Sequence, residues 1–159
     1  MARAAQAAGV PVLEGFHYFF HPVTQRAFEL TRSGALGEIR RVEVAMAMPE
    51  PADDDPRWSL ALAGGALMDL GCYGLHIMRS LGRLGLGTPT VSSARADERT
   101  PGVDARCDVD LEFSGGATGT PELVHGPLEG GTESALRRAF AKLRLGPVFF
   151  GGGFTMSHW

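Results

Sequence analysis

Larger apolar side chains alternate with small or charged ones along Val42–Met48, the pattern of a half-buried strand. Asp108–Phe113 repeats this two-residue period. Ser114-Gly115-Gly116 follows it and predicts a hairpin turn, with a return strand beginning at Ala117-Thr118. A further strand is expected around Val91–Arg95. These patterns predict a sheet built largely from neighbouring antiparallel strands.

Helical patterns occupy other parts of the chain. Ala2–Ala8 favours helix by propensity, and because no capping residue precedes it we expect the last turns of a longer helix. Pro22 suits the first turn of a second helix, which ends at Gly34. Gly64-Gly65 precedes a third, Ala66–Leu81, which is apolar over most of its circumference and should be largely buried.

Between the first two helices, Val10–Leu13 is predicted as a short buried strand, and the aromatic segment Gly15–His21 is predicted to continue it in extended form. The C-terminal region is different. From about Gly119 the chain carries Gly-Pro and Gly-Gly pairs, one candidate helix at Glu133–Arg144, and no sustained strand pattern. We expect residues 119–159 to form an atypical, poorly ordered tail that resembles a frameshifted end.

Composition narrows the class of protein. The 159 residues are 44% hydrophobic and 21% charged, as in one globular domain. A net charge of -3 disfavours nucleic acid or an anionic membrane surface as a partner. No apolar run approaches the roughly 20 residues that cross a bilayer. The 2 cysteines are too few for a disulfide framework, which favours a reducing, cytoplasmic setting.

Three polar side chains interrupt the apolar third helix. Asp69, Tyr73 and His76 are spaced i, i+4 and i+7, which places them on one helix face. A buried carboxylate is costly unless paired, so this face should look onto a partner or a wet cleft. Two interpretations stay open: the three residues line a cleft, or Asp69 caps a loop while the other two make hydrogen bonds in the core.

Weaker signals each have a plain structural alternative. The acids of Asp53–Asp55 suit a cation but more often face solvent in such a loop, and His17 with His21 suits a metal less well than it suits an aromatic cleft wall. Cys72 fits a small apolar spacer that is buried. Trp58 either roofs the cleft or anchors its own loop. We therefore predict no metal site.

The helix motif resembles a known family. Gly64-Gly65-x-x-x-Asp69-x-Gly71-x-Tyr73-x-x-His76 is similar to the signature in the C-terminal domain of the Gfo/Idh/MocA oxidoreductases, in the form found in the dihydrodiol dehydrogenase and glucose-fructose oxidoreductase branch. Other segments, in the same order as in the family, agree with this resemblance, and together they cover roughly residues 1–118: Ala7–Val12, Gly15–Tyr18, Pro22–Ile39 and Asp55-Pro56-x-Trp58.

The resemblance implies an α+β fold with an open, mainly antiparallel sheet, incomplete here, and helices on one face. Residues 1–14 would be a remnant of a nucleotide-binding domain and residues 15–118 the family's C-terminal domain. Tyr73 would exchange a proton with a substrate hydroxyl and Asp69 would orient the substrate, while His76, His17 and Trp58 would contact it. The substrate would be a sugar, polyol or diol, and the open sheet would form a homo-oligomer.

The family's cofactor is NAD or NADP, and two of its features are missing from this sequence. There is no G-x-G-x-x-G turn, and no Glu-Lys-Pro lysine that would lower the pKa of Tyr73. Phe19 also stands where the family often has Arg or Asn. We therefore expect no cofactor-binding residues and no cofactor binding by this chain alone. The alternatives are a non-catalytic oligomerisation module and a truncated pseudoenzyme, so whether the isolated chain is an enzyme stays open.

Overall fold

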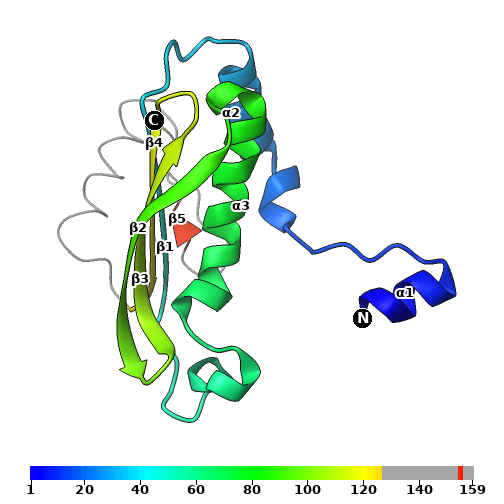
Figure 1. The fold of residues 1–159 in the computed structure, drawn as a ribbon, viewed down its shortest axis with the longest axis vertical. Coiled ribbons are helices and arrows are strands. Elements are labelled where there is room, and N and C mark those ends of the chain that lie inside the picture. The colour runs from blue at the N-terminus through cyan, green and yellow to red at the C-terminus, as the bar shows by residue number, and fades with distance from the viewer. Residues whose placement is uncertain (127–153, 156–159) are drawn as a thin grey trace.

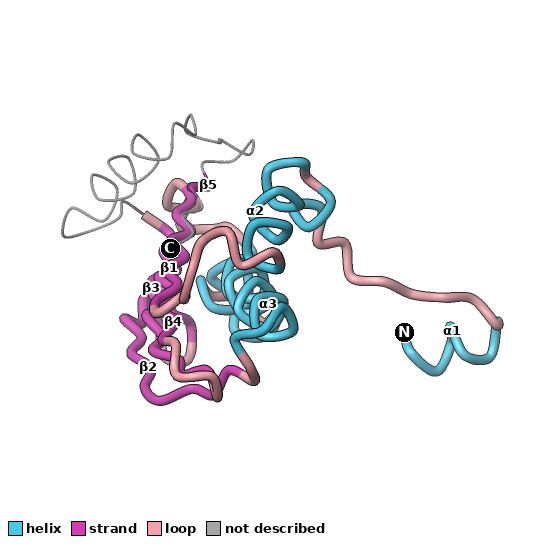
Figure 2. The backbone as a smooth tube through the Cα atoms, turned by 90° about the horizontal axis from the view of Figure 1, so that it is seen from above, coloured by secondary structure: helices cyan, strands magenta, loops and turns pink. Residues whose placement is uncertain are grey.

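The computed structural model describes residues 1–126 and 154–155. Its centre is one sheet with the strand order β2-β3-β4-β1-β5. Helices cover one face of this sheet, as Figures 1 and 2 show. The fold is therefore the open α+β arrangement that the sequence predicted. The strands are β1 Arg41–Met48, β2 Pro89–Thr100, β3 Val103–Phe113, β4 Thr118–His125 and β5 Phe154–Thr155.

Strand pairing in the described residues is mixed. Strands β1 and β4 run parallel, whereas β2–β3, β3–β4 and β1–β5 are antiparallel. The β3–β4 hairpin closes at the predicted turn, where the Gly116 N–H donates to the Phe113 carbonyl at 2.8 Å. The sheet is mainly antiparallel, and its parallel pair joins β4 to a strand that lies far away in the sequence.

Three α-helices are described, α1 Ala2–Ala8, α2 Pro22–Arg32 and α3 Cys72–Leu81. Helix α2 begins at the predicted proline, and Nδ1 of His21 caps it by accepting the Val23 N–H at 3.2 Å. Helix α3 continues a wider π-helical segment, Leu67–Gly71, and is followed by a second one, Gly82–Leu86. The predicted third helix is thus confirmed over nearly its whole length.

The core lies between α3 and the sheet. Ile77 and Met78 are 0% exposed, and Leu123 of β4 is likewise 0% exposed in the same cluster. Burial of each such side chain stabilises the fold by about 1.5–3 kcal/mol. The face of β3 toward the helices carries Cys107, Val109, Leu111 and Phe113. Packing of this face fixes α3, and with it the motif residues, against the sheet.

The segment before α2 differs from the prediction. Val12 and Leu13 are 63% and 89% exposed, and residues 10–13 pair with no strand among the described residues. Figure 1 shows this segment running away from the sheet toward α1. The predicted buried strand is therefore wrong here, because an apolar strand also needs a neighbouring strand. His17–Phe20 forms a 3₁₀ turn instead of the predicted extended backbone.

Strand β4 corrects the boundary expected near Gly119. Gly119–His125 belong to a central strand that pairs with both β1 and β3. Pro121 within it has no N–H to donate, a feature that is uncommon in a central strand. Pro121 lies opposite Val44 in the β1–β4 pairing, and the β3–β4 register leaves it out. The predicted helix at 133–144 lies outside the described residues.

The stretch Leu60–Leu86 is long and apolar enough, by length and composition alone, to cross a membrane, although Asp69, Arg79 and Arg83 divide it into shorter apolar runs. Ala63, Gly65 and Gly85 interrupt it with positive φ angles of 56°, 112° and 124°. Its buried side packs on the sheet and supplies much of the core. We interpret it as the core helix of this domain.

Candidate functional site

The helix that carries Asp69, Tyr73 and His76 does not present them in one common setting. Asp69 lies in the π-helical segment Leu67–Gly71, whereas Tyr73 and His76 lie in α3. A π-helical turn takes more residues than an α-helical turn, so the angle per residue assumed for the i, i+4 spacing does not hold there. The structure consequently divides the predicted face into an aromatic cluster and a polar network.

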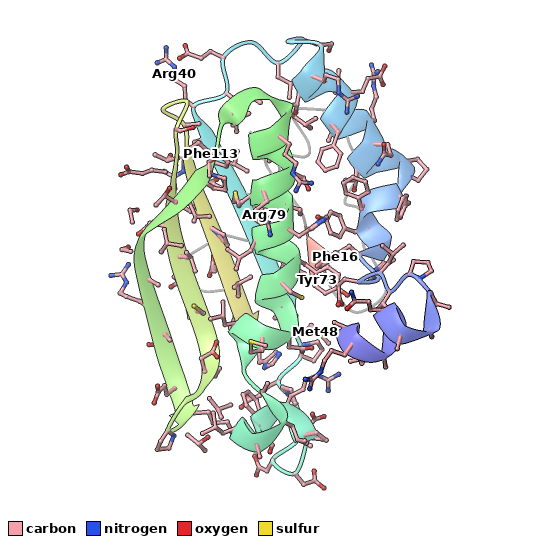
Figure 3. All side chains as sticks on the ribbon, turned by 45° about the vertical axis from the view of Figure 1, so that its right-hand side comes forward. Phe16, Arg40, Met48, Tyr73, Arg79 and Phe113 are labelled. Atoms are coloured by element: carbon pink, nitrogen blue, oxygen red, sulfur yellow. The ribbon has the colours of Figure 1, made fainter. Side chains whose placement is uncertain are left out.

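The aromatic cluster joins α3 to the 3₁₀ segment. Tyr73 meets Phe16 edge-on at 5.5 Å between ring centroids and His17 at 5.8 Å. The Phe16 ring stacks on His76 at 4.0 Å, with an interplanar angle of 12°. Figure 3 shows Phe16 and Tyr73 side by side between the 3₁₀ segment and α3. Two predicted substrate contacts, His17 and His76, are thus brought next to Tyr73.

His76 is already engaged within the fold. Its Nδ1 lies 2.5 Å from the Tyr18 hydroxyl. Burial, with smaller contributions from Arg79 and Arg83, lowers the pKa of His76. A neutral ring then accepts the hydroxyl proton of buried Tyr18, whose own pKa is raised by burial. The core hydrogen bond left open by the sequence is therefore present for His76.

Tyr73 is a half-buried phenol whose surroundings favour its protonated form. Burial raises its pKa first, and the acidic groups of Cys72, Asp69 and Glu14 raise it further. All of these causes act in the same direction. A phenol whose pKa lies above its ordinary value near 10 does not act as a base at neutral pH. To act as a base at neutral pH, such a phenol needs a neighbouring cation that lowers its pKa.

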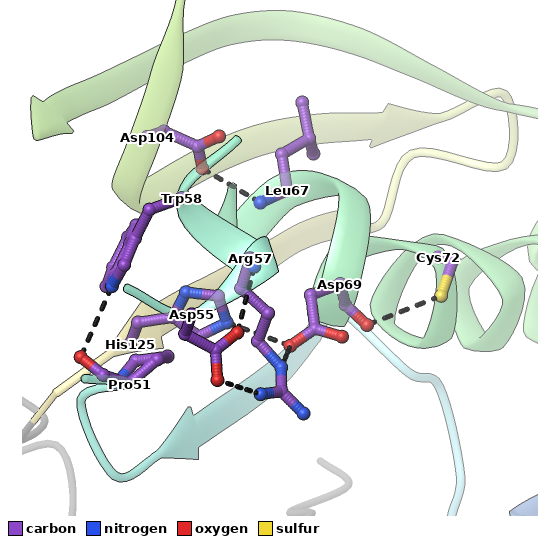
Figure 4. A network of polar contacts seen from close by, with 9 residues as sticks. All are labelled: Pro51, Asp55, Arg57, Trp58, Leu67, Asp69, Cys72, Asp104 and His125. Carbon is purple, nitrogen blue, oxygen red and sulfur yellow. Dashed lines mark hydrogen bonds and ion pairs between the residues drawn. The ribbon is translucent and has the colours of Figure 1, made fainter. Parts of the chain in front are cut away.

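Asp69 is the centre of the polar network in Figure 4. Its Oδ2 accepts a hydrogen bond from Arg57 Nε at 3.1 Å and lies 2.9 Å from His125 Nε2. Arg57 also pairs with Asp55 at 2.9 Å, and the Asp55 side chain caps the short helical turn Pro56–Trp58 by accepting the Arg57 N–H. The Asp69 carboxylate is 33% exposed and so is partly open to solvent.

Trp58 packs against this network through the ring of His125. Its indole N–H donates to the Pro51 carbonyl at 3.2 Å, and the Arg99 guanidinium lies 4.3 Å from its ring centre. The ring also meets His125 edge-on at 5.2 Å. Trp58 is therefore an anchor of its loop that contacts Asp69's partner, the second of the two roles considered for it.

The Gly64-Gly65 pair serves close packing. A Cβ at Gly64 would lie 2.3 Å from the Arg57 carbonyl oxygen, and one at Gly65 would lie 2.2 Å from an Asp104 carboxylate oxygen. The Gly65 N–H donates to the same Arg57 carbonyl at 2.9 Å. The two glycines thus let the Asp55–Trp58 loop lie against the helix start, where Arg57 reaches Asp69.

This helix start does not suit a dinucleotide. The Asp104 carboxylate accepts the Leu67 N–H at 2.8 Å, where a pyrophosphate would need free N–H donors and no anion. In the part of the chain that the structure describes, Gly64-Gly65 is the only glycine pair that opens a helix. This helix start therefore does not fit the pyrophosphate of NAD or NADP.

A pocket of about 350 Å³ opens between α2 and α3, with His76 and Phe16 in its lining but neither Asp69 nor Tyr73.

The structure also places the residues of the weaker sequence signals. His21 caps α2, and the described residues gather no group of three or more metal-ligating side chains. Cys72 is exposed, which corrects the buried position expected for it.

Two residues of the network were not predicted. Arg57 lies inside the Asp-Pro-x-Trp segment, so its place next to a motif carboxylate had a signal that we did not use. His125 had none, because it ends a strand in the region expected to be atypical. Only the alternation of β4 places its side chain on the helix side together with Leu123.

Comparison with known proteins agrees with this architecture. The family model described as the GFO/IDH/MocA C-terminal domain matches residues 24–124. A relative from Haloferax volcanii, D-xylose 1-dehydrogenase (NADP(+)) 2, is 44% identical over 121 residues, covering 72% of this chain and 34% of its own. A dTDP-3,4-didehydro-2,6-dideoxy-alpha-D-glucose 3-reductase from Saccharopolyspora spinosa is 35% identical over 63% of this chain and 29% of its own.

Solved structures show the same fold. The aldose-aldose oxidoreductase of Caulobacter crescentus, complexed with glycerol, matches with a TM-score of 0.68 at 29% identity, over 79% of this chain and 38% of that one. GenD2 of gentamicin A biosynthesis, complexed with NAD, matches with a TM-score of 0.65 at 29% identity, over 81% and 37%. The chain thus spans about a third of the length of these relatives.

Proposed function

Since the chain belongs to the Gfo/Idh/MocA oxidoreductase family, as its C-terminal domain, we propose that it forms the substrate-binding portion of an NAD(P)-dependent enzyme. The proposed substrate is a sugar, polyol or diol whose hydroxyl carbon exchanges a hydride with the nicotinamide. The observation that carries this proposal is the match over residues 24–124, which includes Asp69 and Tyr73 on one continuous helix.

Tyr73 is proposed as the group that exchanges a proton with the substrate hydroxyl. Hydride transfer at a carbinol carbon requires such a group, because the hydroxyl loses its proton as the carbonyl forms. His17 and Phe16 pack against the Tyr73 ring and hold it in place. His17 and His76 are proposed as walls of the substrate cleft. Trp58 is proposed to influence substrate binding indirectly, through its contact with His125.

Asp69 is proposed to orient the substrate by accepting a hydrogen bond from one of its hydroxyls. Its carboxylate is partly exposed and held by Arg57 and His125, so it has both access and a fixed direction. Its negative charge also contributes to the raised pKa of Tyr73. The two groups are therefore within electrostatic reach of each other, although they sit in different surroundings.

The proposed chemistry needs two groups that we propose a nucleotide-binding domain supplies. One is a cation next to Tyr73, and the family resemblance implies a lysine of a nucleotide-binding domain. The other is a dinucleotide site, since the Gly64-Gly65 helix start is occupied by Asp104. We propose that residues 1–14 are the end of such a domain and that the 159-residue chain by itself is inactive.

A non-catalytic oligomerisation module is the alternative. The sheet face away from the helices carries an ion-paired row in which Arg106 pairs with Asp108 at 3.1 Å and with Glu122 at 2.8 Å. A homo-oligomer formed through this face is compatible with either function. Sedimentation analysis of the chain and of an Arg106→Glu variant tests it, because a charge reversal at the centre of such an interface would shift the oligomer toward monomer.

The main experiment compares the 159-residue chain with a fusion to the nucleotide-binding domain of the Haloferax relative. The chain alone should show no saturable binding of NAD or NADP, and the fusion should bind the cofactor and oxidise D-xylose or a related sugar. In the fusion, Tyr73→Phe should lower turnover by roughly 10²-fold or more, the scale of general acid–base catalysis. Saturable cofactor binding by the unfused chain, or an unaffected Tyr73→Phe fusion, would contradict the proposal.

A further inference from the structure

The two oxygens of the Asp69 carboxylate have different surroundings. Oδ2 contacts both Arg57 Nε and His125 Nε2, at 3.1 and 2.9 Å. Oδ1 has no hydrogen-bond partner among the described residues. Since the side chain is 33% exposed, one oxygen is anchored while the other is available to an incoming hydroxyl.

We propose that His125 is a positioning residue that fixes the Asp69 carboxylate, so that Oδ1 is presented to a substrate hydroxyl. This inference rests on the proposed function of Asp69 and deepens it. His125 does not touch the substrate itself, because its side chain is 0% exposed. It acts only through the carboxylate that it holds.

Of the two partners, His125 is the rigid one. It ends β4, where it pairs in register with Met48, and the next residue donates its N–H to the Met48 carbonyl at 2.8 Å. Trp58 packs against its ring. Arg57, by contrast, has a 42% exposed side chain and divides its guanidinium between Asp55 and Asp69. Exposed ion pairs of this kind define a geometry only weakly.

The contact also assigns the histidine's tautomer. Nε2 faces a carboxylate oxygen, which only accepts, so Nε2 carries the proton. Nδ1 is buried without a hydrogen-bond partner. A buried N–H without an acceptor is costly, so Nδ1 is the unprotonated nitrogen of the neutral ring. The arrangement therefore places a fixed N–H donor, His125 Nε2, next to Oδ2 of Asp69.

Nitrogen NMR of the ¹⁵N-histidine-labelled chain tests the contact without any activity. The chain has 5 histidines, and the signals lost in His125→Gln identify the residue. His125 should show a protonated, pyrrole-type Nε2 and a pyridine-type Nδ1, and Asp69→Asn should shift Nε2 more than Nδ1. A protonated Nδ1 in the neutral ring, or no response to Asp69→Asn, would overturn the proposal.

Kinetics of the fusion described above test the consequence. His125→Leu fills the space but donates nothing, and should lower kcat/KM for D-xylose by roughly tenfold or more, the scale of a hydrogen bond to a charged group. His125→Gln places an amide N–H near the position of Nε2 and should recover most of this loss. Thr24→Val is the matched control. Thr24 is a buried polar residue like His125 but lies in α2, so this change should leave kcat/KM unaltered.

The outcomes separate the two proposals. If Tyr73→Phe abolishes turnover while His125→Leu is as active as the parent, His125 has no positioning role and the proposed function stands. If neither variant affects turnover, both proposals fail. If His125→Gln is as impaired as His125→Leu, the role of His125 is in packing alone, which also overturns positioning. Should His125→Leu not fold, the NMR result decides.

Discussion

The Tyr18 hydroxyl lies 2.5 Å from Nδ1 of His76, and this hydrogen bond ties the 3₁₀ segment His17–Phe20 to helix α3. The Phe16 ring stacks on a face of the same imidazole. The chain before this segment, residues 9–15, is exposed. The Tyr18–His76 pair therefore joins the segment that carries His17 to the helix that carries Tyr73, and it supports the candidate site.

Removal of this hydroxyl should destabilise the domain. Tyr18→Phe leaves the ring in the core but removes the hydroxyl that donates a hydrogen bond to His76 Nδ1. The free energy of unfolding should fall by about 1 kcal/mol, the net value of a buried hydrogen bond. Urea denaturation measures the change. Phe20→Leu, at a 78% exposed aromatic of the same segment, is the control and should have a much smaller effect. An unchanged midpoint in Tyr18→Phe would show that the bond contributes nothing.

The lowered pKa of His76 predicts a loss of stability in acid. Burial depresses its pKa in the folded state, so the unfolded chain binds the proton more readily. The contribution is complete above the unfolded value of about 6.5 and is lost as the pH falls through the folded pKa. His76→Phe should therefore show a shallower fall of unfolding free energy below pH 6.5 than the parent chain. Parallel pH profiles for the two proteins would contradict this prediction.

Both tyrosines of the chain should titrate late. The pKa values of Tyr18 and Tyr73 are raised, in each case chiefly by burial, and the chain has 2 tyrosines in all. The midpoint of phenolate formation in the native protein should thus lie above pH 10, whereas the denatured chain should be half-titrated near 10. By the same linkage, stability should be complete below pH 10 and fall as the pH rises beyond it. A native midpoint at or below that of the denatured chain would contradict this prediction.

The packing at Gly64 can be tested by one methyl group. Gly64→Ala would place a Cβ 2.3 Å from the Arg57 carbonyl oxygen, so the loop must move away from the helix start. We expect a loss of about 1–3 kcal/mol in unfolding free energy, as for other overpacked sites. Gly15→Ala is the matched control, because its added Cβ meets nothing within 4 Å and its backbone is not left-handed. Equal stabilities of the two variants would refute the close contact.

Local patterns in the sequence located most of the fold. The alternation of β1, the proline at the start of α2 and the apolar third helix each correspond to a described element, because each is dictated by neighbours in the chain. Val10–Leu13 failed for the opposite reason. Its apolar residues have the composition of a strand, but a strand also requires a partner, and periodicity says nothing about a partner.

The candidate site was predictable in part. The motif identified Asp69, Tyr73 and His76, and His17 joined them through the aromatic segment. The π-helical turn that separates Asp69 from the other two has no signal in residue spacing, since the wheel used to interpret that spacing assumes α-helical geometry. His125 ends a strand in the region expected to be an atypical tail, and it reaches Asp69 only through the sheet order.

The parallel pairing of β1 with β4 has a consequence for how the chain folds. Arg41 pairs with Thr118 and Met48 with His125, so β1 has to wait until nearly all the described domain has been synthesised. Loop closure over such a separation precedes any gain from the pairing, which slows folding. The β2–β3–β4 hairpins are local and should form early. In the interval β1 exposes an unpaired apolar edge, so the nascent chain passes through a stage at which aggregation competes with closure of the sheet.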